Sequence, residues 1–335
     1  MSLIDHRPQV VERNPLARRP KAAGALQKLV EVAADAEAFA AASRSPSTRR
    51  CYSRQWQAFV AWCREHGLAP LPAEPETLAL YLTARARAGL KVATLTQALA
   101  AIGAAHKIAG HASPQGAPAV QQVWEGIRRK LGTAQRRVAP VVVDSLRRMV
   151  GAQPKSLIGT RDRALLVIGF AGGFRRSELV ALDAEHVTFS PDGLVVRVVR
   201  SKTDQEGAGE SVGLPFGSSP ATCPVRLLRA WLSASGIERG ALFRSVRSGG
   251  QLGERLGGVD VARRVKAAAV AAGLDPSTFS GHSLRAGLAT SAAKAGKSDR
   301  AIMRQGRWTS RSTVDRYVRD AQLLDSDNAA SGIGL

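Results

Sequence analysis

The stretch of sequence that decides the fold runs from Phe279 to Asp320 and reads FSGHSLRAGLATSAAKAGKSDRAIMRQGRWTSRSTVDRYVRD. His282 and Arg285 are three residues apart, so one turn of helix would direct both side chains the same way. Farther along, Gly306 ends a helix and Trp308 stands two residues later. An imidazole and a guanidinium on one surface are suited to a phosphate, because both can donate hydrogen bonds to its oxygens.

Tyr317 lies in the last helix that this stretch predicts. An apolar stripe shares its face at spacings of three, four and seven residues and consists of Val314, Val318, Ala321 and Leu324. The stripe turns the phenol toward the surface that His282 and Arg285 line. A tyrosine hydroxyl has an ordinary pKa of about 10, so it needs cationic neighbours or a base to attack at neutral pH. The set indicates phosphoryl transfer by a tyrosine nucleophile, although a tyrosine on an apolar face is more often part of a core.

The composition indicates a polyanionic partner. The 335 residues carry a net charge of +21, and the isoelectric point is about 11.2. Basic residues are spread along the chain, so we expect a broad basic surface, for which nucleic acid is the simplest ligand. The length predicts two domains, and a hydrophobic content of 44% is enough to give each of them a core.

Cysteine content and hydropathy indicate in which cellular compartment the protein works. Cys51, Cys63 and Cys223 are widely spaced, and neither CxxC nor HExxH occurs, so the sequence predicts neither a metal site nor a disulfide framework. The N-terminus has no signal-peptide apolar region, and the longest apolar run, residues 164–174, is too short to span a membrane. We therefore expect a soluble protein of a reducing, bacterial-type cytoplasm, without a membrane partner.

Residues 45–131 predict a compact, all-helical domain. Its helices begin at residues 45–47, 78, 94 and 118 and end at residues 67, 88, 110 and 131. The basic edges of this domain supply the candidates for DNA contact, which are Arg49, Arg50, Arg54, Arg128, Arg129 and Lys130. Residues 1–44 form an N-terminal extension that we expect to be partly disordered, with a helix over residues 25–42.

A short polar and basic stretch, GTAQRRVAP at residues 132–140, predicts a linker and adds Arg136 and Arg137 to the candidates for DNA contact. It would let two lobes close round a rod-like ligand. Residues 141–324 predict an α+β domain, and residues 325–335 a C-terminal tail. The predicted helices of that domain cover residues 143–150, 161–172, 224–235, 260–272, 299–305 and 313–324. Strands over residues 187–189, 194–200 and 211–214 form a small antiparallel sheet.

Two more residues in the second domain are candidates for phosphate chemistry. GGFRRSEL places Arg175 at the start of a helix directly after a glycine turn, where backbone amides and a guanidinium suit a phosphate. Lys202 lies in a loop between strands, from which an ammonium can protonate a leaving hydroxyl. Each is, by itself, more often an ordinary surface residue. AGKS at residues 295–298 is not a nucleotide-binding loop, because Ser291 replaces its first glycine and no strand precedes it.

Taken together, the order and spacing of these motifs resemble the tyrosine recombinase (phage integrase) family. Trp308 stands where most members carry a second histidine, which narrows the resemblance to the Cre-like branch of the family. AFVAWCREHGLAPLPAEPETLALYL, at residues 58–82, is similar to that branch as well. The resemblance covers residues 45–335. It implies a mainly helical protein with an N-terminal core-binding (SAM-like) domain and a C-terminal α+β catalytic domain.

The resemblance implies a site-specific recombinase that cuts and rejoins double-stranded DNA. Tyr317 would attack a scissile phosphate and form a 3′-phosphotyrosyl bond, while Arg175 and Arg285 hold the non-bridging oxygens. The covalent bond conserves the energy of the broken one, so neither a nucleotide nor a metal cofactor is expected. By analogy with the family, a homotetramer would exchange strands between two inverted-repeat sites. Residues 325–335 are more polar and richer in glycine than the tail that relatives pass to a neighbouring subunit.

Four further residues receive roles from the same resemblance. His282 and Trp308 would donate hydrogen bonds to the scissile phosphate, and Lys202 would protonate the departing 5′-oxygen. Glu178 would orient Arg175 or His282. Two other classes share part of this pattern: a type IB topoisomerase or hairpin telomere resolvase, and a catalytically silent DNA-binding regulator. The similarity of the N-terminal domain disfavours the former class, and the complete set of site residues disfavours the latter.

Overall fold

The computed structural model describes residues 32, 35, 43–133, 138–199 and 209–322, and the side chains of these up to residue 319. The chain divides into two compact units, residues 1–135 and 136–335. The predicted helix over residues 25–42 falls outside the described residues, except that residues 32 and 35 are helical. Within the described part of the chain, no helix is long and apolar enough to cross a membrane.

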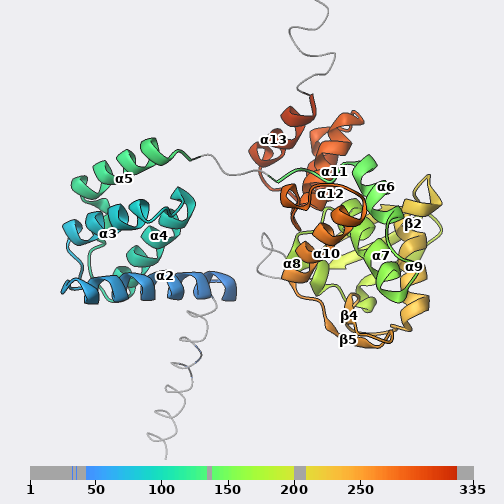
Figure 1. The fold of residues 1–335 in the computed structure, drawn as a ribbon, viewed down its shortest axis with the longest axis horizontal. Coiled ribbons are helices and arrows are strands. Elements are labelled where there is room, and N and C mark those ends of the chain that lie inside the picture. Colours follow the sequence, from blue (N-terminus) through green and yellow to red (C-terminus); the bar gives the residue numbers. More distant parts are fainter. Residues whose placement is uncertain (1–31, 33–34, 36–42, 134–137, 200–208, 323–335) are drawn as a thin grey trace, which may run out of the picture. The chain divides into compact units, whose positions relative to one another are not determined.

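The N-terminal unit is a bundle of helices, labelled in Figure 1. Its elements are α2 (Pro46–Glu65), α3 (Pro75–Arg87), α4 (Val92–Ile108), the short 3-10 helix η1 (Pro114–Gly116) and α5 (Pro118–Leu131). Proline at the first position starts α2, α3 and α5, where its missing N–H is not needed. The Ser45 hydroxyl caps α2 by accepting a hydrogen bond from the Thr48 backbone N–H. Helix α2 packs on α4, and α3 on α5, around Phe59, Tyr81 and Ile102.

The C-terminal unit begins with helices and continues through a small sheet. Its first helices are α6 (Val143–Gly151), α7 (Leu157–Ala171) and α8 (Arg176–Ala181). The strands β1 (Val187–Ser190), β2 (Gly193–Val198) and β3 (Glu210–Pro215) follow in the antiparallel order β1-β2-β3. After them come α9 (Pro224–Ser235) and an antiparallel pair, β4 (Arg244–Val246) and β5 (Leu252–Arg255). The unit ends with α10 (Gly258–Ala271), α11 (Ser283–Lys294), α12 (Asp299–Gly306) and α13 (Arg311–Gln322).

One face of the three-stranded sheet is part of the main core. Val196 of β2 lies opposite Val187 of β1 and Val212 of β3, and the side chains of β2 alternate between buried and exposed. Trp231 of α9 is fully buried in the same core, and its indole N–H donates to the Leu242 carbonyl at 2.8 Å. Helix α7 packs against α9 and against α11, so the core supports the N-terminal end of α11.

The predicted fold class is confirmed: the protein is mainly helical, with an N-terminal helical unit and small antiparallel sheets in the C-terminal one. Two predictions need correction. The second sheet, β4-β5, was not predicted, and α7 begins at Leu157 instead of residue 161 because the Ser156 hydroxyl caps it. Strand β2 ends at Val198, and residue 200, where the sequence placed its end, lies outside the described residues.

Candidate active site

Four of the predicted catalytic residues meet at one cleft of the C-terminal unit. Arg175 comes from the turn between α7 and α8, His282 and Arg285 from the start of α11, and Trp308 from the turn after α12. All four line a cleft with a volume of about 960 Å³. Tyr317 of α13 joins them through a hydrogen bond to His282. Four chain segments that are far apart in the sequence therefore supply one site.

Helix α13 directs Tyr317 toward the start of α11. Val314 is fully buried, and Tyr317 and Val318 pack beside it against α11 and α12. The Tyr317 hydroxyl lies 2.8 Å from His282 Nε2, which is hydrogen-bond distance. As expected, the apolar stripe turns the phenol inward, with Val314 and Val318 packed beside it. The side chains of Ala321 and Leu324, the other two residues of the stripe, are not described.

The His282 imidazole stands among cations. Desolvation of the ring and the charge of Arg285 lower the pKa of His282 below its ordinary value. The guanidiniums of Arg176 and Arg175 act in the same direction. The ring is therefore neutral at pH 7, and its Nε2 can accept a proton from the phenol when Nδ1 carries the hydrogen.

Arg285 is the most deeply buried cation of the cleft, with 2% of its surface exposed. Its Nη1 donates to the Gly173 carbonyl, and its guanidinium carbon lies 4.1 Å from the centre of the Trp308 ring. Nη2 has no hydrogen-bond partner among the described residues. Burial and the charge of Arg175 lower the pKa of Arg285 to about 9, so it stays protonated at neutral pH. A buried donor without a partner is suited to a phosphate oxygen.

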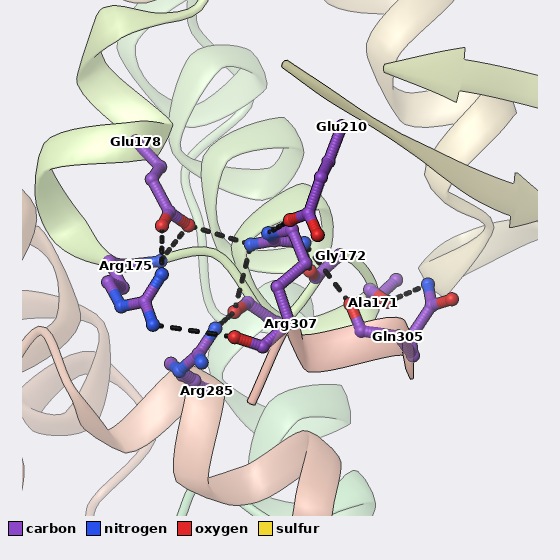
Figure 2. Close-up of polar contacts among 9 residues, drawn as sticks. Ala171, Gly172, Arg175, Glu178, Glu210, Arg285, Gln305 and Arg307 are labelled. Atoms are coloured by element: carbon purple, nitrogen blue, oxygen red, sulfur yellow. Dashed lines mark hydrogen bonds and ion pairs between the residues drawn. The ribbon is translucent and has the colours of Figure 1, made fainter. Parts of the chain in front are cut away.

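Glu178 holds Arg175 in place. Its carboxylate accepts hydrogen bonds from the Arg175 backbone N–H at 2.9 Å and from Arg175 Nη1 at 2.6 Å. The same carboxylate accepts a third bond, from Arg307 Nη2 at 2.7 Å, so Glu178 lies between two guanidiniums (Figure 2). Burial would raise the pKa of Glu178, but the charge of Arg307 and the hydrogen bonds from both arginines outweigh it and lower the pKa. This geometry fits the prediction that Glu178 orients Arg175. The second side chain bonded to Glu178 is Arg307 and not His282.

Two glycines make the close packing of this site possible. Gly173 has a φ of 55°, a backbone conformation that favours glycine, and a Cβ there would lie 2.7 Å from Leu288 Cδ2. A Cβ at Gly306 would collide with the Trp308 ring. The first glycine lets the Gly173 carbonyl face Arg285, and the second lets Trp308 stack under that guanidinium.

Three further candidates, Lys202, Arg136 and Arg137, fall outside the described residues, so their predicted roles stay predictions. The other candidates for DNA contact are exposed and lie on two helices of the N-terminal unit: Arg49, Arg50 and Arg54 on α2, and Arg128, Arg129 and Lys130 on α5. Among the described residues, no group of three or more His, Cys, Asp or Glu side chains could hold a metal ion, and the three cysteines are free thiols.

The sequence did not single out two arginines that belong to this site. Arg176 lines the cleft beside Arg175, and Arg307 lies behind it. The doubled arginine of GGFRRSEL was a signal for Arg176. For Arg307 the signal was weaker: an arginine directly follows the last residue of α12, where a helix most often has glycine or asparagine.

Comparisons with known proteins identify the family of the chain. The sequence model of the Phage integrase family matches residues 141–323, and that of the Phage integrase, N-terminal SAM-like domain, matches residues 37–112. An integrase/recombinase xerD homolog of Selenomonas ruminantium is 38% identical over 292 residues, which cover 86% of this chain and 85% of the relative. Recombinase cre of Escherichia phage P1 is 29% identical over 326 residues, with coverage of 91% and 90%.

A solved structure shares the fold. The structure of a lambda integrase (residues 75–356) dimer bound to a COC′ core site matches this chain with a TM-score of 0.58 and 18% sequence identity. The match covers 85% of this chain and 92% of that one. At this level of identity the likeness concerns the fold.

Proposed function

The chain belongs to the phage integrase family of tyrosine site-specific recombinases, and from this premise we propose that it exchanges DNA strands between two inverted-repeat target sites. The reaction proceeds through a 3′-phosphotyrosyl intermediate in a tetrameric synapse, with double-stranded DNA as its partner. The observation that carries the proposal is the hydrogen bond of 2.8 Å between Tyr317 and His282 beside the cleft that Arg175 and Arg285 line. In this arrangement the nucleophile, the base and the phosphate-binding groups lie side by side in one chain.

Cleavage breaks one phosphodiester bond and forms another. The Tyr317 oxygen bonds to phosphorus as the bond from phosphorus to the 5′-oxygen breaks, and His282 Nε2 accepts the phenolic proton. Arg175 and Arg285 bind the non-bridging oxygens, where charge grows in the transition state. Lys202 supplies the proton for the leaving 5′-hydroxyl. Rejoining reverses these steps with a 5′-hydroxyl from the partner duplex, so each strand keeps its number of phosphodiester bonds.

His282 takes a more defined role in this proposal than the sequence assigned to it. A donor to the phosphate needs an N–H on the cleft side, whereas a base needs a lone pair facing the phenol. The bond to Tyr317 and the lowered pKa of His282 both support the base. Trp308 keeps the role of a hydrogen-bond donor to the phosphate, and the face of its ring also packs against the Arg285 guanidinium.

The two units divide the work. Residues 45–131 form the core-binding domain, whose basic residues on α2 and α5 contact the DNA backbone, and residues 132–140 link it to the catalytic domain at residues 141–324. Residues 325–335 are the C-terminal tail, which has no assigned role in this proposal. Support comes from the match of the SAM-like domain and from the solved lambda integrase, which is a dimer bound to a core site. Both units contact the same duplex.

The test begins by finding the target site. The full chain is incubated with sheared DNA of its source organism, the reaction is stopped with detergent, and DNA that is bound covalently to protein is sequenced. We expect an enriched inverted repeat. A duplex of that sequence, nicked near the cleavage point so that the cut strand is lost, then serves as a trap for the adduct.

Tyr317→Phe should form no adduct with the nicked duplex and should bind the intact duplex as tightly as the wild type. Tyr52→Phe, the same change in α2 of the N-terminal unit, is the matched control and should form the adduct normally. An adduct with Tyr317→Phe would refute the proposal, as would failure of the wild type to trap any DNA. Relaxation of supercoiled DNA without exchange between two sites would identify a topoisomerase instead.

A further inference from the structure

Arg307 has an unusual backbone. It follows the last residue of α12 with φ 57° and ψ 49°, and it is the one non-glycine residue with a positive φ in the part of the chain that the structure describes. Side chains disfavour this conformation because Cβ crowds the backbone, so a residue with a long side chain persists there only when other contacts hold it.

The Arg307 side chain is buried, with 3% of its surface exposed. Its Nη1 donates to the carbonyls of Gly172 and Gln305, each at 3.1 Å, and its Nη2 donates to Glu178 at 2.7 Å and to the Gly173 carbonyl at 3.4 Å. The guanidinium carbon lies 4.9 Å from the centre of the Phe174 ring. Arg307 thus contacts three consecutive residues of the turn between α7 and α8, directly before Arg175.

Through these contacts Arg307 touches the support of both phosphate-binding arginines (Figure 2). It shares the Glu178 carboxylate with Arg175, and its own carbonyl accepts a hydrogen bond from Arg175 Nη2 at 3.4 Å. It also shares the Gly173 carbonyl with Arg285. In the proposed mechanism one phosphate binds both guanidiniums, which come from different segments of the chain, and Arg307 is bonded to the groups that hold each of them.

We propose that Arg307 is a positioning residue that sets the spacing of Arg175 and Arg285 for the scissile phosphate. The inference rests on the proposed function and deepens it, because it assigns a role to a residue that does not touch the DNA. Fixing reacting groups in place lowers the barrier only when the geometry is tight, and small misplacements slow a reaction strongly.

The charges of the network support the same role for Arg307. Two guanidiniums, Arg175 and Arg307, share one buried carboxylate, the Arg285 guanidinium is near enough to feel both of them, and like charges repel. Glu178 can serve both Arg175 and Arg307 only while it is ionised, and the charge of Arg307 helps to keep it so. Gln305, two residues before, donates to the Ala171 carbonyl at 2.9 Å and to the Gly213 carbonyl of β3 at 3.0 Å. Hydrogen bonds to the end of α7 and to β3 therefore hold the end of α12, and they fix the position of Arg307.

The most informative variant is Arg307→Gly. Glycine accepts the positive φ without strain, so the turn keeps its backbone while the guanidinium is lost. Arg307→Lys keeps a charge but cannot donate in one plane to Glu178 and to the Gly172 carbonyl. Arg304→Gln, an exposed arginine on the same helix, is the control for the loss of a charge. Thermal unfolding of the full chain shows whether each variant is folded.

The readout is the single-turnover rate of adduct formation on the nicked duplex, with the dissociation constant of the intact duplex measured beside it. We expect Arg307→Gly to cleave about a hundredfold more slowly with unchanged binding, Arg307→Lys to be slowed as well, and Arg304→Gln to match the wild type. A duplex with a neutral methylphosphonate at the scissile position needs the two guanidiniums less. On that duplex the defect of Arg307→Gly should therefore shrink.

The pH profile gives a further readout. Without Arg307 the pKa of Glu178 rises, so on acidification Arg307→Gly should lose cleavage rate through protonation of Glu178 at a higher pH than the wild type, in addition to the loss that protonation of His282 causes in both. A wild-type cleavage rate in folded Arg307→Gly or Arg307→Lys would overturn the inference. So would an equal defect on the phosphate and methylphosphonate duplexes, because it would indicate general damage to the fold. If the wild type forms no adduct at all, the proposed function fails first, and the inference fails with it.

Discussion

The arginines of the two units differ in burial, and this difference suits them to different roles. In the C-terminal unit, Arg285 and Arg307 are buried, and Arg175 is 19% exposed with its guanidinium bonded to Glu178. In the N-terminal unit, Arg50 and Arg129 lie exposed on α2 and α5. Removing a charge from water costs several kcal/mol, so it persists only with partners that fix its direction. An exposed charge stays hydrated and attracts DNA from any direction.

This contrast predicts two kinds of effect. Loss of a buried guanidinium should slow the reaction and leave the affinity for DNA unchanged, since the transition state depends on its direction. Loss of an exposed one should lower the affinity and its salt dependence and leave the rate at saturating protein unchanged. A variant that changed both quantities in the same proportion would break the comparison.

The largest effect is expected for Arg285→Ala. It removes the buried donor that we propose binds the scissile phosphate, and we expect the single-turnover rate to fall about a thousandfold, or roughly 4 kcal/mol. The affinity for the intact duplex should stay within the range of the wild type. Adduct formation on a quenched-flow timescale measures the rate, and Arg50→Ala provides the control. A loss of affinity in Arg285→Ala that accounts for the whole defect would contradict the assignment.

Glu178→Gln tests the buried network. It leaves Arg175 and Arg307 without their shared carboxylate, and we expect it to lower the free energy of unfolding of the C-terminal unit by about 3 kcal/mol. Urea unfolding of the full chain measures this. Glu210→Gln is the control, because Glu210 is 52% exposed and lies 3.9 Å from Arg307 Nε. An equal loss in both variants would show that burial of the pair contributes nothing.

The same variant has a pH dependence of definite sign. The pKa of Glu178 is lower in the folded protein than its ordinary value of about 4.3. Its contribution is therefore fully present above that ordinary value and is lost as the pH falls through the lower, folded-state pKa. The difference in stability between wild type and Glu178→Gln should be constant near neutral pH and should shrink in acid.

These results also show how far the sequence could predict the molecule. Helix α5 was predicted at its observed bounds because Pro118 starts it and Gly132 follows it, and both are local signals. The pair β4-β5 was missed because Arg244–Val246 and Leu252–Arg255 are too short to show an alternating pattern. Spacing and chemical type singled out Arg175, Arg285 and Tyr317 from the order of motifs along the chain, and the structure brings these three residues to one site.

Arg307 could not be predicted in the same way. Its contacts depend on the carbonyls of Gly172 and Gly173, which are 135 and 134 residues away in the chain, and on a left-handed backbone that no pattern of residue types reveals. For the same reason, the sequence left open whether Glu178 orients Arg175 or His282. Motifs predict which residues act on a ligand, whereas the residues that support them are found only when the segments are packed together.

The pH dependence of cleavage tests the other half of the site. The pKa of His282 is lowered by desolvation and by the charges of Arg285, Arg176 and Arg175, so it lies below the ordinary value of about 6.5. If neutral His282 accepts the phenolic proton, the rate should be constant from pH 8 to 7 and fall only below about 6.5. His282→Gln should be about a hundredfold slower and should lose this limb. A wild-type rate that rises on acidification would identify His282 as a donor instead.

The smallest effect is expected for Arg50→Gln, and it bears most directly on the comparison. Arg50 is exposed on α2, so its proposed contact with DNA releases a counterion and has no fixed geometry. The logarithm of the binding constant plotted against that of the salt concentration should lose about 0.9 of its slope, and the cleavage rate at saturating protein should not change. Fluorescence anisotropy of the labelled target duplex over a series of salt concentrations measures the slope. Arg87→Gln, an exposed arginine at the end of α3 without a proposed role, should leave the slope unchanged. If both variants behave alike, the exposed charges act only through the net charge of the chain, and the basic edge of the N-terminal unit is not a binding surface.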